Sequence, residues 1–237
     1  MDNYKVTDYN NEIDCIESCH DVDSDGIGEP TVQIETNRAA ICGVIDSELT
    51  LSHSSYGEKI YVAIVAVSRH SGTADKLRVL FPERILQGYG RYPSVGETWS
   101  IKGQIRTYNV REGGRRLSVC VFAKEAECVH PDENDCCNDV FLDGYICKPP
   151  IYRKTPKDRE ICDILLAVNR KYKMSDYVPC ILWGRNAQAM SKAEVGERAQ
   201  VYGRLQSREY SKTLEDGTAE TRTAYELSIS SYCLQNF

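Results

Sequence analysis

The sequence predicts an all-β protein built from two similar units, and three observations lead to this fold class. First, a glycine turn followed by a strand occurs twice, as Val95-Gly-Glu97 before residues 99–108 and as Val195-Gly-Glu197 before residues 199–210. Second, β-branched and aromatic runs of four to nine residues alternate with Gly, Ser, Asp or Pro. Third, 237 residues with 41% hydrophobic content suffice for two small cores.

Each unit shows the same order of predicted elements. The strands expected in residues 37–127 are 39–45, 59–67, 76–81, 99–110 and 116–122, and those expected in residues 139–231 are 139–147, 159–169, 177–183, 198–210 and 221–230. A short helix is expected over 186–192. Five strands with one short helix between the third and fourth match the OB-fold, a small Greek-key barrel. We therefore expect two tandem OB-fold barrels, each with a short helix.

Acidic residues gather outside these units. Residues 1–36 hold ten carboxylates and one lysine, a net charge of −9 with little hydrophobic periodicity, which predicts an acidic disordered leader. The rest of the chain then carries −6 minus −9, or +3, which is compatible with a polyanionic ligand. A second acidic stretch, 128–138, predicts a linker between the barrels, and residues 232–237 form a short tail.

Composition also limits compartment and chemistry. The eleven cysteines are scattered and several lie in apolar runs, as expected of reduced thiols in the cytoplasm. We find no signal peptide and no apolar run long enough for a membrane span, so we expect a soluble protein. The calcium-like run Asp21–Gly26 has Val32 where a glutamate ligand is needed, and no Cys-x-x-Cys pair is present. Without a catalytic motif either, we expect no metal, no cofactor and no enzymatic activity.

Strand alternation predicts a ligand surface on the second unit. Val201, Gly203 and Leu205 belong to one face, which we expect in the core. The opposite face carries Tyr202, Arg204, Gln206, Arg208 and Tyr210, and the neighbouring strand adds Tyr177 and Trp183. Exposed rings can stack on nucleic-acid bases and cations can meet phosphates. Alternatively, the tyrosines are ordinary amphipathic strand positions with a buried ring and a wet hydroxyl group.

The second unit resembles the bacterial single-stranded DNA-binding proteins from about Val140 to Ser231. The motifs that carry the resemblance are Leu166-Ala-Val-Asn-Arg-Lys-Tyr172, Trp183-Gly184 and Tyr202-Gly-Arg-Leu-Gln-Ser-Arg-Glu-Tyr210. The resemblance implies that Tyr172, Tyr177, Trp183 and Tyr210 stack on DNA bases. With the neighbouring polar residues, the predicted DNA contacts of this unit also include Arg170, Lys171, Lys173, Arg185, Tyr202, Arg204 and Arg208.

The first unit resembles this family less closely. The resemblance places Phe81 where the second unit has Trp183, but Lys76 and Arg78 would then face the core at a high cost. Either the strand contains a bulge or Phe81 is a core residue, and we favour the core. DNA contacts predicted for this unit are Arg69, Arg106 and Tyr108.

The resemblance implies a function and a partner. We expect the chain to bind single-stranded DNA with little sequence specificity, protecting strands exposed in DNA replication, repair and recombination. Because the family presents four OB units, a homodimer is expected, with replication or repair proteins as possible partners. The family's acidic tail is not expected here, because residues 231–237 contain no acid. The alternatives are an OB-fold adaptor of a primosome type that works through protein contacts, and an RNA-binding OB protein.

Overall fold

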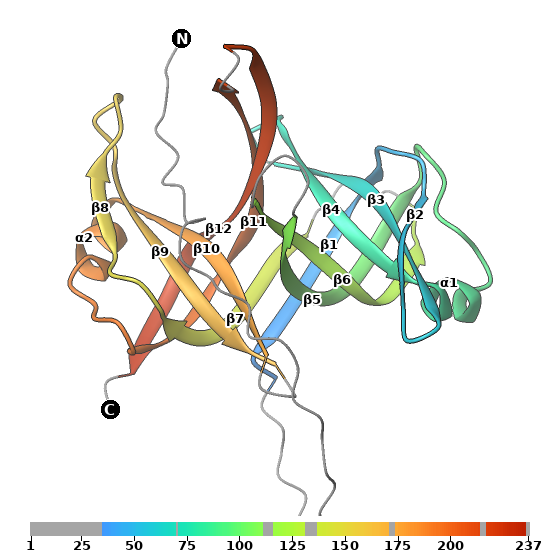
Figure 1. The fold of residues 1–237 in the computed structure, drawn as a ribbon, viewed down its shortest axis with the longest axis horizontal. Coiled ribbons are helices and arrows are strands. Elements are labelled where there is room, and N and C mark those ends of the chain that lie inside the picture. Colours follow the sequence, from blue (N-terminus) through green and yellow to red (C-terminus); the bar gives the residue numbers. More distant parts are fainter. Residues whose placement is uncertain are drawn as a thin grey trace, which may run out of the picture.

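The computed structural model describes residues 35–69, 71–110, 116–130, 137–170, 174–213 and 217–235. These ranges form twelve strands and two short helices, arranged as two barrels side by side (Figure 1). Most of the expected leader, including Asp21–Gly26, and the centre of the expected linker lie outside the described residues. The domain limits inferred from the sequence therefore remain a prediction.

The first half contains six strands and a helix. They are β1 (Asn37–Ile45), β2 (Thr50–Ser55), β3 (Glu58–Ser68), β4 (Ala74–Pro82), α1 (Glu83–Tyr89), β5 (Thr98–Val110) and β6 (Arg116–Cys128). Strand β1 pairs with both β3 and β5, while β4 pairs with β3 and, in parallel, with β6. These pairings, with β5 against β6, close five strands into a barrel, and β2 adds to the edge of β3.

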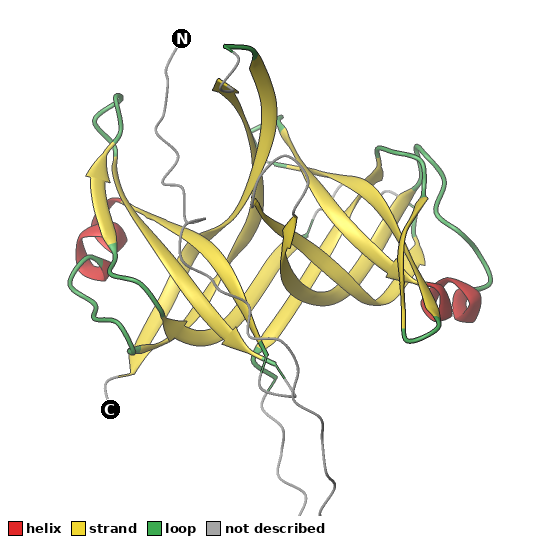
Figure 2. Ribbon diagram, in the orientation of Figure 1, coloured by secondary structure: helices red, strands yellow, loops and turns green. Residues whose placement is uncertain are grey.

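The second half repeats this order. Its elements are β7 (Asn138–Ile146), β8 (Ile151–Lys154), β9 (Glu160–Asn169), β10 (Ser175–Trp183), α2 (Gly184–Met190), β11 (Arg198–Thr213) and β12 (Ala219–Gln235). Strands β7, β9, β10, β12 and β11 close the second barrel, with β8 outside β9. The prediction of tandem OB-folds is confirmed, with each helix between the third and fourth barrel strands at opposite ends of the molecule (Figure 2). The sequence reading missed β2 and β8, which are short edge strands.

The repeated glycines have a steric reason. Gly103 in β5 and Gly203 in β11 lie at matching bulges, whose extra residues are Lys124 of β6 and Ser230 of β12. A Cβ atom on Gly103 would lie 2.1 Å from the Phe122 carbonyl oxygen, and one on Gly203 would lie 2.2 Å from that of Ser228. No other residue fits such a close approach of two strands, so the repeat seen in the sequence records a constraint on barrel closure.

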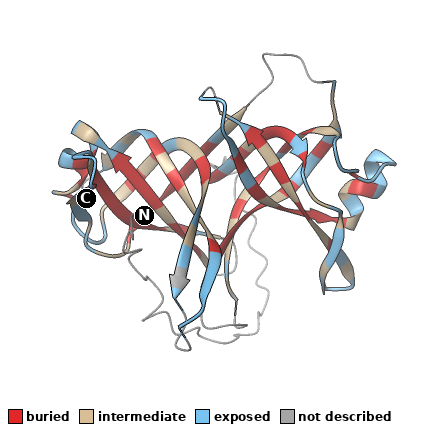
Figure 3. Cartoon of the chain, turned by 90° about the horizontal axis from the view of Figure 1, so that it is seen from above, coloured by how far each residue is buried: buried red, intermediate tan, exposed pale blue. Residues whose placement is uncertain are grey.

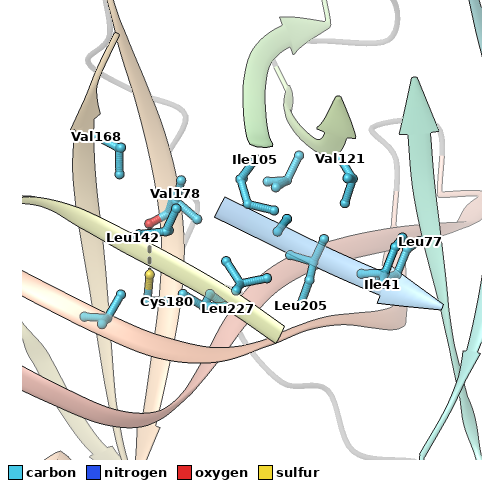
Figure 4. Close-up of a cluster of buried hydrophobic side chains, with 14 of the residues drawn as sticks. Ile41, Leu77, Ile105, Val121, Leu142, Val168, Val178, Cys180, Leu205 and Leu227 are labelled. Carbon is cyan, nitrogen blue, oxygen red and sulfur yellow. Dashed lines mark hydrogen bonds between the residues drawn. The ribbon is translucent and has the colours of Figure 1, made fainter. Parts of the chain in front are cut away.

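The cores of the two barrels meet at their shared strands. Strand β1 pairs antiparallel with β7, with Ala39 opposite Val140, so the barrels form one continuous sheet of twelve strands. Figure 4 shows apolar side chains from both barrels in one cluster around this junction, among them Ile41 and Leu142. Figure 3 shows that buried residues follow the strands of both barrels. Because Ala39 and Val140 also correspond in the repeat, an approximate two-fold axis passes between them.

Phe81 is a core residue, which confirms the favoured alternative. Its side chain is fully buried together with Leu77 and Val79, so Arg78 faces outward. Leu80 pairs with Phe122 of β6, and Ile181 pairs with Ser228 of β12. Because Phe122 and Ser228 occupy matching positions in the two barrels, Leu80 corresponds to Ile181. Counting two residues on, Pro82 and not Phe81 occupies the position of Trp183. The sequence resemblance was wrong by one residue at this position.

Two buried aspartates hold the barrels together in a reciprocal arrangement, which we call the aspartate clasp. Asp75 of the first barrel accepts hydrogen bonds from Arg204 Nη1 at 3.1 Å and from the Ser207 backbone amide at 2.8 Å, both in the second barrel. Asp176 of the second barrel accepts equivalent bonds from Arg106 Nη1 at 3.1 Å and from the Thr107 amide at 2.6 Å, both in the first.

Each clasp aspartate also pairs with an arginine of its own barrel. Arg69 Nε lies 2.7 Å from Asp75 Oδ2, and Arg170 binds Asp176 through two nitrogens. Hydroxyl groups complete the symmetry, because the Lys76 amide donates to Ser207 Oγ and the Tyr177 amide donates to Thr107 Oγ1. Since the side chain of Asp75 is 1% exposed and that of Asp176 is 0% exposed, their charges depend on these partners rather than on water.

The clasp predicts a large loss of stability when one aspartate is removed. Asp176→Ala leaves two partly buried guanidinium groups without their carboxylate, so we expect the free energy of unfolding to fall by about 3–5 kcal/mol. Urea unfolding measures this difference.

The matched control is Asp46→Ala, which removes the carboxylate of an exposed pair with Lys76 and should change the stability by less than about 0.5 kcal/mol. Equal, small effects of both substitutions would contradict the structural role of the clasp.

Candidate nucleic-acid interface

The outer face of β10 presents the exposed ring of Trp183. Alternate residues Val178, Cys180 and Leu182 are buried in the core, whereas Trp183 is 40% exposed. The strand ends there because Gly184 adopts a φ of +57° and begins α2, which buries Ala187 and Met190 against the barrel. The short helix thus fixes the end of β10 and leaves the indole at the surface.

Trp183 lines a surface pocket of about 310 Å³. Its other walls come from five strands of the second barrel and from one residue of the first. The lining residues are Arg69, Arg153, Thr155, Ile161, Ile181, Gln206, Ser207, Arg208 and Glu226. We call this hollow the Trp183 pocket. An apolar floor beside a ring, with arginines at the rim, suits a flat base with an anionic backbone.

Hydrogen bonds hold the polar wall of the Trp183 pocket in place. Arg153 Nε lies 2.7 Å from Asp163 Oδ2, and Gln206 Nε2 donates to Glu226 Oε1 at 2.7 Å. The two acids are thus occupied by neighbouring donors. Fixed partners reduce the entropy lost when a ligand binds, because the side chains are already ordered.

Four of the predicted DNA-binding arginines belong to the aspartate clasp. These residues are Arg69, Arg106, Arg170 and Arg204. Each clasp aspartate meets two guanidinium groups, so each group of charges keeps a net charge of +1. Burial lowers the pKa of Arg106 first of all, and the nearby Arg170 lowers it further, which reflects this crowding of cations. In the structure these four arginines bind the clasp aspartates and orient the barrels, and their contact with DNA stays a prediction.

The predicted aromatic residues do not share one surface. Tyr202 lines a second, larger groove of about 770 Å³ at the junction of the barrels, where its ring lies 4.7 Å from that of Phe141. Arg204 lines the same groove. Residues farther along β11, from Gln206 to Arg208, reach the Trp183 pocket instead.

The remaining predicted residues occupy different places around the second barrel. Tyr177 is partly buried on the same face of β10 as Trp183, and Arg185 is exposed at the start of α2. Tyr210 lies on the long hairpin of β11 and β12, opposite Arg222. In the first barrel Tyr108 is exposed on β5. Three predicted residues, Lys171, Tyr172 and Lys173, lie outside the described residues.

Strand β8 contributes residues that the sequence analysis missed. Arg153 of β8 and Thr155 just after this strand line the Trp183 pocket, and Tyr152 of β8 is exposed. The available signal was the run Tyr152-Arg-Lys154, which combines a ring with two cations as the predicted strands do. It was overlooked because four residues at a sheet edge give too short an alternation to define a face.

The different burial of the two tryptophans predicts a spectroscopic signature. Trp99 is 0% exposed and its Nε1 donates to Glu97, whereas Trp183 is 40% exposed. Iodide should therefore quench part of the wild-type emission and almost none of the emission of Trp183→Phe, which also shifts to shorter wavelength. Equal quenching of the wild type and the variant would contradict an exposed Trp183.

The sequence of the second barrel matches a known family. Residues 137–234 fit the single-strand binding protein family. Single-stranded DNA-binding protein 2 of Streptococcus agalactiae is 33% identical over 104 residues, which cover 41% of this chain and 76% of that protein. Single-stranded DNA-binding protein 1 of Lactococcus lactis is 32% identical over 80 residues, and the match covers 31% of this chain and about half, 53%, of that relative.

The whole fold is also similar to a solved structure. The single-stranded DNA-binding protein of Thermus aquaticus superposes with a TM-score of 0.67 at 18% identity, covering 85% of this chain and 93% of that one. This similarity shows the two-barrel fold, and the match to the Streptococcus agalactiae protein shows the family. The chain therefore belongs to the single-strand binding protein family.

Proposed function

We propose that this protein binds single-stranded DNA with little sequence specificity, and so protects strands exposed in replication, repair and recombination. The observation that carries the proposal is the Trp183 pocket, an exposed indole with arginines from β8, from β11 and from the first barrel. Membership of this family supports the assignment and confirms the expectation that the chain is not an enzyme.

Base stacking and phosphate contacts both contribute to the proposed binding of DNA. Every base has a π-face, so a base packed on the Trp183 indole is held whatever its identity, at about 1–3 kcal/mol. Arg153 and Arg208 line the same pocket and Arg185 is exposed next to Trp183, so these cations can meet the phosphates on either side of the stacked base. Displaced counterions then make the affinity strongly dependent on salt.

The aspartate clasp contributes to this surface indirectly. Arg69 belongs to the clasp and also lines the Trp183 pocket, so the first barrel supplies part of the wall that faces the DNA. The net charge of +1 at the Asp75 group adds to the positive field along the strand. Changing the orientation of the barrels therefore alters the DNA surface as well as the fold.

A homodimer with four OB barrels is the proposed assembly. The large groove at the junction of the barrels has an apolar floor, where Arg38 Cζ lies 5.1 Å from the centre of the Phe141 ring. Its walls carry charges of both signs, namely Arg38, Lys102, Lys124, Glu35, Glu125 and Asp139. A second copy related by a two-fold axis can bury the floor and place each charge opposite one of the other sign.

A cytoplasmic location is proposed with this function. Cys120, Cys162 and Cys180 are buried thiols, and such thiols persist in a reducing compartment. None of the helices in the described residues is long and apolar enough to cross a membrane. Replication and repair proteins of the cytoplasm are the candidate protein partners.

Removing the indole tests the function. Trp183→Ala should weaken binding to oligo-dT by about 5- to 150-fold, the loss expected for one stacked base. Fluorescence anisotropy of labelled oligo-dT, oligo-U and duplex DNA at several salt concentrations measures the affinities, with dT bound most tightly.

The matched control is Tyr92→Ala, which removes a ring that is 43% exposed near α1 of the first barrel and should leave the affinity unchanged. Equal binding of oligo-U by the wild type would favour an RNA-binding protein, and no binding of any strand would favour an adaptor.

A charge introduced into the large groove by substitution tests the proposed homodimer. Light scattering should give the wild type twice the 26.8 kDa mass of one chain, and Tyr202→Glu should give a single-chain mass because it buries an unpaired charge at the interface.

Tyr152→Glu places the same charge on another exposed tyrosine, on β8 and outside the large groove, and should leave the dimer intact. A wild type that remains a single chain at micromolar concentrations would exclude the homodimer.

A further inference from the structure

The approximate two-fold axis relates the Trp183 pocket to a surface of the first barrel. The strand registers match Ile161 with Ile60, Ile181 with Leu80 and Glu226 with Cys120. On β5 and β11 they match Arg106 with Gln206 and Tyr108 with Arg208. The counterpart surface lacks the tryptophan, because Pro82 stands in its place, but it gains the ring of Tyr108.

Arg78 breaks the symmetry of this arrangement. Asp75 and Asp176 each meet two clasp arginines, but the residue of β10 that corresponds to Arg78 is Pro179. The Asp75 group holds the barrels without a third arginine. Arg78 is therefore not needed for the clasp, and its presence calls for another explanation.

The contacts of Arg78 leave part of its guanidinium group unsatisfied. Its Cζ lies 6.0 Å from the centre of the Tyr108 ring, in cation–π range. Among the described residues, its Nε is buried and has no hydrogen-bond partner. A buried donor without an acceptor costs free energy, so Arg78 is held at this position despite a cost, and only the other nitrogens of its guanidinium group can reach a bound anion.

Positive charge exceeds negative charge around Arg78. Burial raises the pKa of the Cys120 thiol to about 12, while the nearby Arg78, Arg106 and Arg170 act in the opposite direction. These three guanidinium groups share one buried carboxylate, that of Asp176, which leaves a net charge of +2. Such an excess at a partly exposed position favours a bound anion.

The surface next to Arg78 is apolar. Ile60, Leu80 and Cys120 form a small buried cluster on the outer side of the first barrel, with Val62 and Phe122 packed against it. The corresponding positions of Cys120 and Phe122 in the second barrel are Glu226 and Ser228. Tyr108 is 36% exposed beside this cluster. A sugar or base can lie on such a floor while its phosphate meets the arginine.

We propose that Arg78 binds a phosphate of single-stranded DNA and that Tyr108 stacks on an adjacent base, so that a strand leaving the Trp183 pocket continues over the first barrel. This inference rests on the proposed function and adds a second binding site to it. The two barrels thus engage DNA through different residues: tryptophan with arginines in the second barrel, and arginine on tyrosine in the first.

Oligonucleotide length separates the two sites. One OB barrel covers about 4–16 nucleotides, so a strand of about 8 nucleotides fits the second barrel alone and one of about 35 spans both. Arg78→Met keeps the length of the side chain and removes the charge. It should weaken binding of the long oligo-dT about tenfold and leave binding of the short one unchanged. The slope of log K against log salt should become shallower by about 0.7 for the long strand.

Two variants accompany the test. Arg91→Met removes one exposed cation from the loop between α1 and β5, outside the large groove and the Trp183 pocket, and should leave the affinity and slope unchanged for both lengths. Tyr108→Ala should weaken binding of the long strand only, and thermal unfolding checks that each variant is folded.

Unchanged affinity and salt slope of Arg78→Met for the long strand would overturn the proposal, as would equal losses for both lengths. Trp183→Ala reports on the proposed function separately, because it should weaken binding of the short strand as well. If Trp183→Ala has no effect on either length, the proposed function fails, whatever Arg78→Met shows.

Discussion

The reciprocal burial of Asp75 and Asp176 is the interaction on which the rest of the structure depends. Each carboxylate has left water and is held by an arginine of its own barrel, an arginine of the other barrel and a backbone amide of the other barrel. Buried charges tolerate little displacement, because a buried charge that loses a partner is no longer compensated for its lost hydration. The two barrels therefore have a fixed relative orientation, reinforced by the pairing of β1 with β7.

This fixed orientation determines the charge of the surface where the two barrels meet. Each aspartate neutralises only one of the arginines around it, so the clasp leaves positive charge where the barrels meet. Arg69 illustrates both roles, since it binds Asp75 and lines the Trp183 pocket of the other barrel. Structural and ligand-binding requirements thus converge on the same side chains, and a test of DNA binding by these arginines must separate loss of contact from loss of orientation.

Sequence patterns predicted the local structure well. Period-two alternation located the long strands and the exposure of Trp183, and it showed that Phe81 could face outward only if Lys76 and Arg78 faced the core. Patterns failed where a strand was very short or very long. The four residues of β8 gave no usable alternation, and along the 16 residues of β11 alternation did not show that Tyr202 and Arg208, assigned to one face, line different hollows.

The sequence by itself determined the two-barrel fold, because barrel closure requires glycine at positions 103 and 203 and alternation along each strand. The repeat and the resemblance to the family were also found from the sequence alone. Only the tertiary structure decided what the charged side chains do. Alternation reports which face a residue occupies but not which partner lies opposite, and Asp75 meets Arg204 across 129 positions of chain. The uneven surroundings of Arg78 and Pro179 likewise became visible only when the two barrels could be superposed residue by residue.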